Sequence, residues 1–198
     1  MGRRKATGNF RRKNTHRSLR SEPGELDDCL VDAEAREDLW EKLRAYADFA
    51  RAFGPQGTAL DAGQPWWIHP YASPLGEVRI LGFNTVLLSF DDQDEKRLAL
   101  GKRQIKSIPD QDTPDGHLLV VLQHHPWEWL HDGMEQRRWL GRRPHLFFCG
   151  HIHQPEGIVG LRLDGQAHLV LVAGAGHGEA GEPPAHGYAW GRLTWEGK

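Results

Sequence analysis

Histidine is the residue type in this chain that is best placed to do chemistry. Six of the twelve histidines lie between His124 and His153, and two short segments concentrate them. The segment His124–His125–Pro126 follows one apolar run, and Gly150–His151–Ile152–His153 follows another. Two histidines separated by one loop residue can direct both imidazoles at one small region, and neutral imidazole is a common ligand of borderline divalent metals. These segments therefore predict a metal site.

Each histidine segment comes at the end of a predicted strand. The runs 118–123 and 145–149 are apolar without polar alternation, which is typical of strands buried on both faces of a sheet. Gly150 would end the second strand and allow the backbone to turn sharply. In open α/β sheets, sites form where the carboxyl ends of parallel strands meet at one edge. We therefore expect the two segments to bring histidines to a common edge.

The rest of the chain alternates helical and extended patterns. A helix is predicted over Asp32–Phe53, and a second one from Glu95 or Arg97 to Ile108. The apolar stripe of the first predicted helix is Leu39, Leu43, Tyr46, Ala50 and Phe53. Residues 55–76 are predicted as a loop, residues 127–140 as a short amphipathic stretch, and further strands at 77–83, 85–90, 157–163, 167–173 and 187–195. Strand–helix–strand order followed by successive strands predicts a layered α/β fold.

Charge is distributed unevenly, although the net charge is only −2. The first twenty residues carry eight Lys or Arg and no acid, whereas the rest of the chain has seventeen basic and twenty-seven acidic residues. We therefore expect a basic disordered tail over residues 1–24 and a globular domain over 25–198. Aromatic residues are not interleaved with the basic ones beyond Phe10, so we do not expect a nucleic-acid partner. Without a signal sequence or a long apolar span, we expect a cytoplasmic protein that has no contact with a membrane.

Taken together, the two histidine segments resemble the calcineurin-like metallophosphoesterases. The matching residues are Val120–Pro126, which contains the H-H-P element, and Phe147–His153, which contains the G-H-x-H element. Smaller features that resemble the bacterial phosphodiesterase-like branch are Ile80–Thr85, Gly101 with Gln104, Trp129–Leu130 and Ala173–Gly176. The resemblance extends over residues 35–195, and it implies a layered α/β sandwich of the metallophosphoesterase type.

For the chemistry, the resemblance implies a metal-dependent phosphoester hydrolase, either a phosphodiesterase or a phosphomonoesterase. Two divalent ions (Mn, Fe or Zn) would activate water for attack on the phosphorus of a phosphoester substrate. Carried over to this sequence, His124 and His151 would bind one ion and His153 the other. His125 would be a neighbour that supports the ligands and not a ligand itself, and the resemblance identifies no catalytic residue apart from the metal ligands.

The first half of the family's pattern has no intact counterpart in this sequence. Its Asp-x-His, Gly-Asp and Gly-Asn-His-Asp elements are missing. Gly8–Asn9–Phe10 has Phe in place of the histidine, and Asp115–Gly116–His117 precedes its strand. The chain therefore resembles a truncated domain, of which only the C-terminal half is present. The alternative to an enzyme is a non-catalytic module that binds at most one metal and acts with a partner chain, which would complete the fold, or with a nucleic acid.

Overall fold

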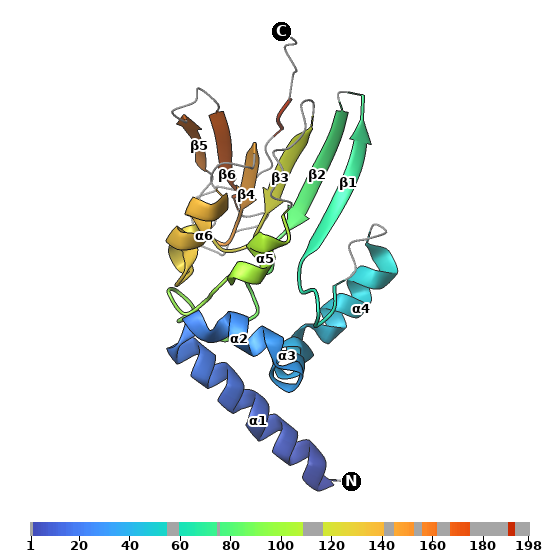
Figure 1. The fold of residues 1–198 in the computed structure, drawn as a ribbon, viewed down its shortest axis with the longest axis vertical. Helices are drawn as coiled ribbons and strands as arrows, with labels where there is room; N and C mark the ends of the chain where they lie inside the picture. Colours follow the sequence, from blue (N-terminus) through green and yellow to red (C-terminus); the bar gives the residue numbers. More distant parts are fainter. Residues whose placement is uncertain are drawn as a thin grey trace, which may run out of the picture.

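The computed structural model describes residues 2–54, 60–74, 76–108, 117–140, 145–152, 156–161, 167–174 and 190–192. These residues form helices and a six-stranded mixed sheet, so the chain has an α/β fold (Figure 1). The α-helices are α1 (Gly2–Ser21), α2 (Leu26–Val31), α3 (Ala33–Trp40), α4 (Arg44–Phe53), α5 (Lys102–Lys106) and α6 (Gly133–Leu140). The short 3-10 helices are η1 (Pro23–Glu25), η2 (Glu41–Leu43) and η3 (Trp127–Trp129). The strands are β1 (Trp67–Ser73), β2 (Gly76–Gly82), β3 (Leu118–Leu122), β4 (Leu146–Cys149), β5 (Glu156–Leu161) and β6 (Ala167–Val172).

The sheet has the strand order β1-β2-β3-β4-β6-β5. Strands β2, β3, β4 and β6 are parallel, and the two edge strands β1 and β5 each pair antiparallel with their neighbour. The predicted strands 118–123 and 145–149 are confirmed as β3 and β4, which are neighbours at the centre of the sheet. Because both are parallel and central, their carboxyl ends lie side by side at one edge of the sheet.

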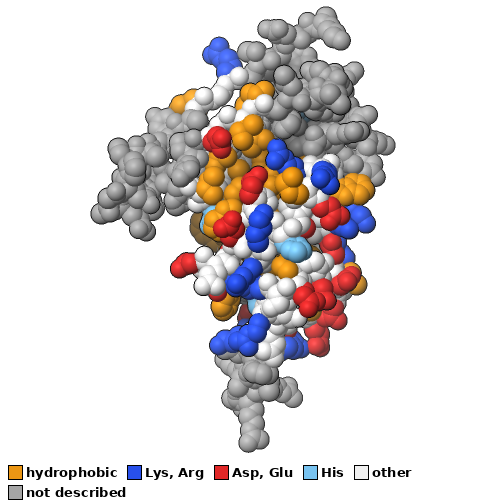
Figure 2. Space-filling model, turned by 90° about the vertical axis from the view of Figure 1, so that its left-hand side faces the viewer, with side chains coloured by type: hydrophobic (Ala, Val, Ile, Leu, Met, Phe, Trp, Pro, Cys, Tyr) orange, Lys and Arg blue, Asp and Glu red, His pale blue; other side chains and the backbone are white. Residues whose placement is uncertain are grey.

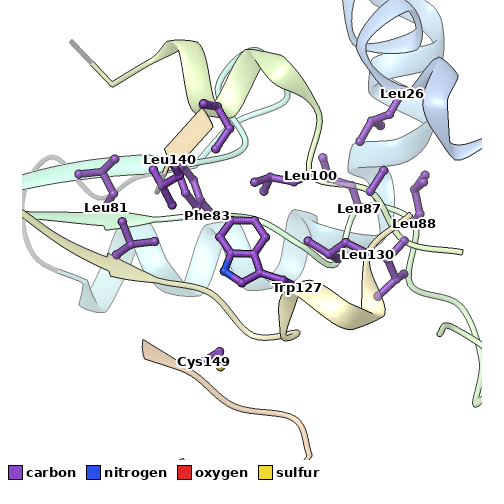
Figure 3. Packing of buried hydrophobic residues seen from close by; sticks show 14 of the residues in the cluster. Leu26, Leu81, Phe83, Leu87, Leu88, Leu100, Trp127, Leu130, Leu140 and Cys149 are labelled. Atoms are coloured by element: carbon purple, nitrogen blue, oxygen red, sulfur yellow. The ribbon is translucent and has the colours of Figure 1, made fainter. Parts of the chain in front are cut away.

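The main hydrophobic core lies between one face of the sheet and the segments that connect its strands. Leu81, Val121 and Phe147 occupy matching register positions on β2, β3 and β4, and all three belong to this core. The indole of Trp127 stacks on the ring of Phe147, with 5.1 Å between the ring centroids. Figure 3 shows Trp127 among leucines that come from distant parts of the chain. The other core residues labelled in Figure 3 are Leu26, Leu81, Phe83, Leu87, Leu88, Leu100, Leu130, Leu140 and Cys149.

The connections between the parallel strands are tied to each other and to α2. Backbone hydrogen bonds join Lys96 to Trp129 and His131 to Leu98, which aligns the β2–β3 connection with the β3–β4 connection. The carboxylate of Asp27 in α2 accepts hydrogen bonds from the backbone N–H groups of Lys102 and Arg103, the first two residues of α5. A side chain 75 residues away in sequence thus satisfies N–H groups that the helix start leaves without internal partners.

The basic N-terminal segment forms α1, where the sequence predicted a disordered tail. Figure 1 shows α1 projecting from the end of the molecule where α2 and α3 lie. In its last two turns, Leu19 is only 4% exposed and belongs to the core, and His16 is buried. Composition alone predicted a solvated tail because α1 has few apolar residues, but two buried positions one turn apart are enough to dock the end of the helix.

Ion pairs from the middle and the end of α1 also hold it against acidic residues of the domain. Arg11 Nε lies 2.8 Å from the buried carboxylate of Asp38 in α3. Arg20 pairs with the buried carboxylate of Asp94, and its other terminal nitrogen lies 2.6 Å from Asp91. Acidic and basic side chains also lie interspersed over much of the face drawn in Figure 2. The positive charge of the first twenty residues is therefore partly neutralised by contact with acidic residues of the rest of the chain.

Several other elements differ from the predictions. The helical region 32–53 is confirmed in position but is divided by η2, and two predicted stripe residues, Tyr46 and Phe53, are exposed. The predicted strand 85–90 is a turn, in which Leu87 and Leu88 both reach the core. The predicted helix ending at Ile108 begins only at Lys102, after Gly101 at φ 79°. A strand in the predicted loop 55–76 was missed; it is β1, which tolerates Pro70 because it is an edge strand.

Two of the predicted strands near the C-terminus are confirmed as β5 and β6. The predicted strand 187–195 lies mostly outside the described residues, of which 190–192 are not in a strand. No helix within the described part of the chain combines the length and the hydropathy that crossing a membrane requires.

Candidate metal centre

The two histidine segments lie side by side because the backbone hydrogen bonds of the sheet continue past the ends of β3 and β4. The N–H of Gln123 donates to the carbonyl of Phe148, and the N–H of Gly150 donates to the carbonyl of His124. As a result, His124 Nε2 lies 3.1 Å from His151 Nδ1, although the two residues are 27 positions apart in sequence. The expectation that these histidines share one edge of the sheet agrees with the structure.

His151 occupies a strained backbone conformation. Its φ angle is 73°, and the N–H of Ile152 donates to the carbonyl of Gly150 at 2.9 Å, which closes a three-residue turn centred on His151. A positive φ is uncommon for a residue with a Cβ atom, and such residues cluster at functional sites. The sequence assigned the sharp turn to Gly150, but Gly150 is not among the residues with positive φ. The turn at His151 is what directs its ring toward His124.

His125 contributes a third ring to the cluster. The ring centroids are 4.7 Å apart for His124 and His125, 5.0 Å for His124 and His151, and 4.4 Å for His125 and His151. One nitrogen from each ring can be chosen so that all three lie within 4.8 Å of one another. His124 is exposed, His151 is half-buried and His125 is only 2% exposed, so the cluster extends from the surface into the interior.

The buried ring of His125 is neutral at neutral pH. Burial lowers the pKa of His125 to about 4, and repulsion by the neighbouring His124 and His151 acts in the same direction. A neutral imidazole keeps one ring nitrogen with a free lone pair, which is the form that binds metal ions.

Thr85 holds His125 through two hydrogen-bonding contacts. The hydroxyl oxygen of Thr85 accepts a hydrogen bond from the backbone N–H of His125 at 3.2 Å, and it lies 2.9 Å from the ring atom Nδ1. Thr85 is 1% exposed and follows β2, the strand next to β3. The sequence contained no local signal for this contact, because the two residues are 40 positions apart.

Gln104 holds the backbone that carries Thr85. Its side chain is completely buried, accepts a hydrogen bond from the N–H of Asn84 and donates to the carbonyl of Asn84. The side chain of Asn84 in turn accepts from the N–H of Val86 at 3.0 Å. Asn84 is not among the residues with positive φ, so these hydrogen bonds fix its backbone without a left-handed conformation.

Trp129 packs against two of the three histidines. Its indole is stacked on the ring of His125, with 6.0 Å between centroids, and meets the ring of His151 edge-on at 4.2 Å. The sequence placed Trp129 only in the motif that follows H-H-P and did not predict contact with the site. These ring contacts restrict how far either imidazole can rotate.

The other predicted ligand, His153, lies outside the described residues. His145, which precedes β4, has a structural role, since its Nδ1 accepts a hydrogen bond from the backbone N–H of Leu119 at 3.1 Å. The cluster found among the described residues therefore contains two of the three predicted ligands, His124 and His151, together with His125.

Neither a scan against models of protein families nor a search of curated proteins finds a match for this chain. The chemistry of the cluster therefore has to be judged from its geometry. Two nitrogens that each lie about 2.1 Å from one ion are about 3.0 Å apart at a right angle and about 3.4 Å apart at the tetrahedral angle. The separation of 3.1 Å between His124 Nε2 and His151 Nδ1 falls within this interval and is also an ordinary hydrogen-bond distance. The pair therefore fits either a hydrogen bond between the two rings or a shared divalent ion.

Proposed function

We propose that the chain is a metal-dependent phosphoester hydrolase in which His124 and His151 bind a divalent ion. The observation that carries this proposal is the separation of 3.1 Å between their ring nitrogens at the carboxyl ends of two adjacent parallel strands. The strained φ of His151 supports it, because strain of this kind persists where the surrounding structure holds a residue for a function. The H-H-P and G-H-x-H elements, which resemble those of the calcineurin-like metallophosphoesterases, supply the reaction class.

The residues of this chain take distinct roles in the proposed reaction. When bound, a divalent ion supplies Lewis-acid polarisation of a phosphoryl oxygen and lowers the pKa of a water molecule. The exposed position of His124 leaves the outer side of the site open to a phosphoester. Trp129 keeps the His151 ring in place, and the bonds of the sheet edge keep the two ligand segments in register. His153 remains a predicted ligand of a second ion.

The proposal is tested by hydrolysis of an aryl phosphodiester with added Mn²⁺, comparing the wild type with His151→Ala. We expect the wild type to hydrolyse the ester and His151→Ala to lose the activity together with Mn²⁺ binding measured by calorimetry. His131→Ala removes an exposed histidine that follows η3 and serves as the matched control with wild-type activity. Hydrolysis that is the same in wild type and His151→Ala would contradict the proposal.

A second candidate is a non-catalytic module that binds one ion. The composition of the cluster favours it, because the described residues gather three imidazoles, which suit a single ion, whereas two-ion hydrolytic centres need more ligands. Metal analysis of the purified chain separates the two candidates. Two ions per chain with hydrolysis support the enzyme, and one ion without hydrolysis supports the module.

A further inference from the structure

We propose that His125 is the third ligand of the ion held by His124 and His151, and that Thr85 is the residue that positions it. This inference rests on the proposed metal site, but it departs from the motif, in which His125 is only a neighbour of the ligands. Three imidazoles with an open fourth position are a ligand set used for catalytic Zn²⁺. The class of ion is therefore a borderline divalent cation such as Zn²⁺ or Co²⁺.

The first argument is the position of the His125 ring. It lies between Trp129, which is stacked on it, and the His151 ring, whose centroid is 4.4 Å away. A shared ion requires nitrogens about 3.0 to 3.4 Å apart. The His124–His151 pair has this separation already. One ring nitrogen from each of the three histidines lies within 4.8 Å of the others, so the three rings reach this spacing with shifts of less than about 2 Å.

The second argument is the bonding of the His125 ring. Metal-binding histidines typically donate their other ring N–H to a protein oxygen, which selects the tautomer and the ring orientation. The Thr85 hydroxyl oxygen lies 2.9 Å from Nδ1, within reach as such an acceptor. In the tautomer that carries the proton on Nδ1, this contact would leave Nε2 with the lone pair. The hydroxyl also receives the backbone N–H of His125, so that it holds the ring and the main chain of one residue at once.

The third argument is the rigidity of Thr85 itself. Gln104 bonds both the N–H and the carbonyl of the preceding residue, Asn84, and Gln104 and Thr85 are both fully buried. The path Gln104–Asn84–Thr85–His125 thus connects α5 to the metal site through hydrogen bonds and a single peptide link. Because the buried Gln104 bonds both backbone groups of Asn84, it restricts the backbone that carries Thr85 and so supports the contact between Thr85 and His125.

The test is titration of the full-length apoprotein with CoCl₂, with calorimetry for affinity and visible absorption for the coordination sphere. We expect at least one Co²⁺ per wild-type chain, bound at the three-histidine cluster. Thr85→Val has nearly the same shape without the hydroxyl, and we expect it to weaken Co²⁺ binding by about 10- to 100-fold. Thr85→Ser restores the hydroxyl and should bind within a few-fold of wild type. His125→Gln should bind more weakly than Thr85→Val, and the control His131→Ala should be unchanged.

The outcomes separate this inference from the proposed function. If wild type binds no Co²⁺, or if His151→Ala binds it as wild type does, the metal site itself is refuted. If His151→Ala abolishes binding while Thr85→Val and His125→Gln both bind like wild type, only the role of His125 is refuted.

A measurement on the wild type does not depend on whether the variants fold. In ¹⁵N-labelled protein loaded with Zn²⁺, the ring nitrogen shifts of the histidines count the coordinated imidazoles. We expect the Nε2 signal of His125 to move on Zn²⁺ addition while its Nδ1 stays protonated. A His125 ring with unchanged shifts overturns the inference.

Discussion

The ion pair between Arg20 and Asp94 attaches α1 to the rest of the domain, and its removal should lower the free energy of unfolding. We predict that Arg20→Ala destabilises the protein by about 2–3 kcal/mol. Arg20 and Asp94 are both buried, and removal of one partner of a buried ion pair typically costs about 3–5 kcal/mol because the other charge is left uncompensated. We expect a smaller loss, since Asp94 keeps the hydroxyl of Ser89 at 2.6 Å and the backbone N–H of Phe90 as donors.

The pKa of Asp94 agrees with this reasoning. Burial by itself raises the pKa of the carboxyl group, but hydrogen bonds from Ser89, Arg20 and two backbone N–H groups outweigh it and hold the pKa below its ordinary value. The carboxylate is therefore charged in the folded protein at neutral pH. Substitution of Arg20 therefore leaves the charged carboxylate of Asp94 with fewer hydrogen-bond donors, which costs more free energy than the loss of an exposed ion pair.

Urea unfolding followed by circular dichroism measures the effect, with Arg17→Ala as the matched control. Arg17 lies on the same helix but is exposed, so its substitution should change the free energy of unfolding by no more than about 0.5 kcal/mol. Arg and Ala have similar helix propensities, so the difference between the two variants reports the contacts of Arg20, which are its ion pairs with Asp94 and Asp91, its bonds to the carbonyls of Leu88 and Gln93 and its position over the Phe90 ring. Equal stabilities of Arg20→Ala, Arg17→Ala and wild type would refute the docking of α1 on the domain.

Three further predictions concern single positions. Burial lowers the pKa of His16 to about 4 from 6.5, so that between these pH values the unfolded chain binds a proton that the folded chain excludes. Its contribution is fully present above pH 6.5 and is lost on acidification to pH 4, by at most about 3 kcal/mol. His16→Gln should make the fall in urea stability between pH 7 and pH 4.5 shallower but not remove it, because burial also lowers the pKa of His125 to about 4. His151→Gly should raise the unfolding free energy by about 1 kcal/mol relative to His151→Ala, while neither variant binds Co²⁺, because glycine relieves the strain at φ 73°. Gly82→Ala should lower the melting temperature and reduce the free energy of unfolding by about 2–3 kcal/mol, because the new Cβ would lie 2.1 Å from the Trp67 ring. The control Gly157→Ala should be close to neutral, because its Cβ would meet Leu171 at an ordinary 3.6 Å. Equal melting temperatures of the two variants would contradict this prediction.

Features of the site that depend on local sequence could be predicted well. The apolar runs of β3 and β4 indicated buried strands, and buried parallel strands are rich in apolar residues because both faces are covered. Chain direction then placed the residues that follow them at the same edge, which is why His124 and His151 were predicted to meet. The sharp turn was predicted after the strand, at Gly150, but the positive φ falls on the next residue, His151, for which the local sequence carries no signal.

Features that depend on contacts between distant segments could not be predicted from local pattern. The hydroxyl of Thr85 reaches His125 across 40 residues of sequence, and nothing near either residue indicates the contact. The same holds for α1, whose Arg20 meets Asp94 across 74 residues, so that composition suggested a solvated tail. In both cases the packing of whole helices and strands determines which side chains come into contact. The free energy of a buried polar group then depends on whether this packing supplies a hydrogen-bond partner.

The sequence by itself therefore determined that the chain forms an α/β fold with histidines at the carboxyl edge of two central strands, because strand burial and strand direction follow from hydrophobic pattern. The tertiary structure decided which of these histidines converge, how each ring is oriented and how the basic segment is bound. Those properties depend on atoms brought together from β2, β3, β4 and the turns after them, and their distances exist only once the sheet has assembled.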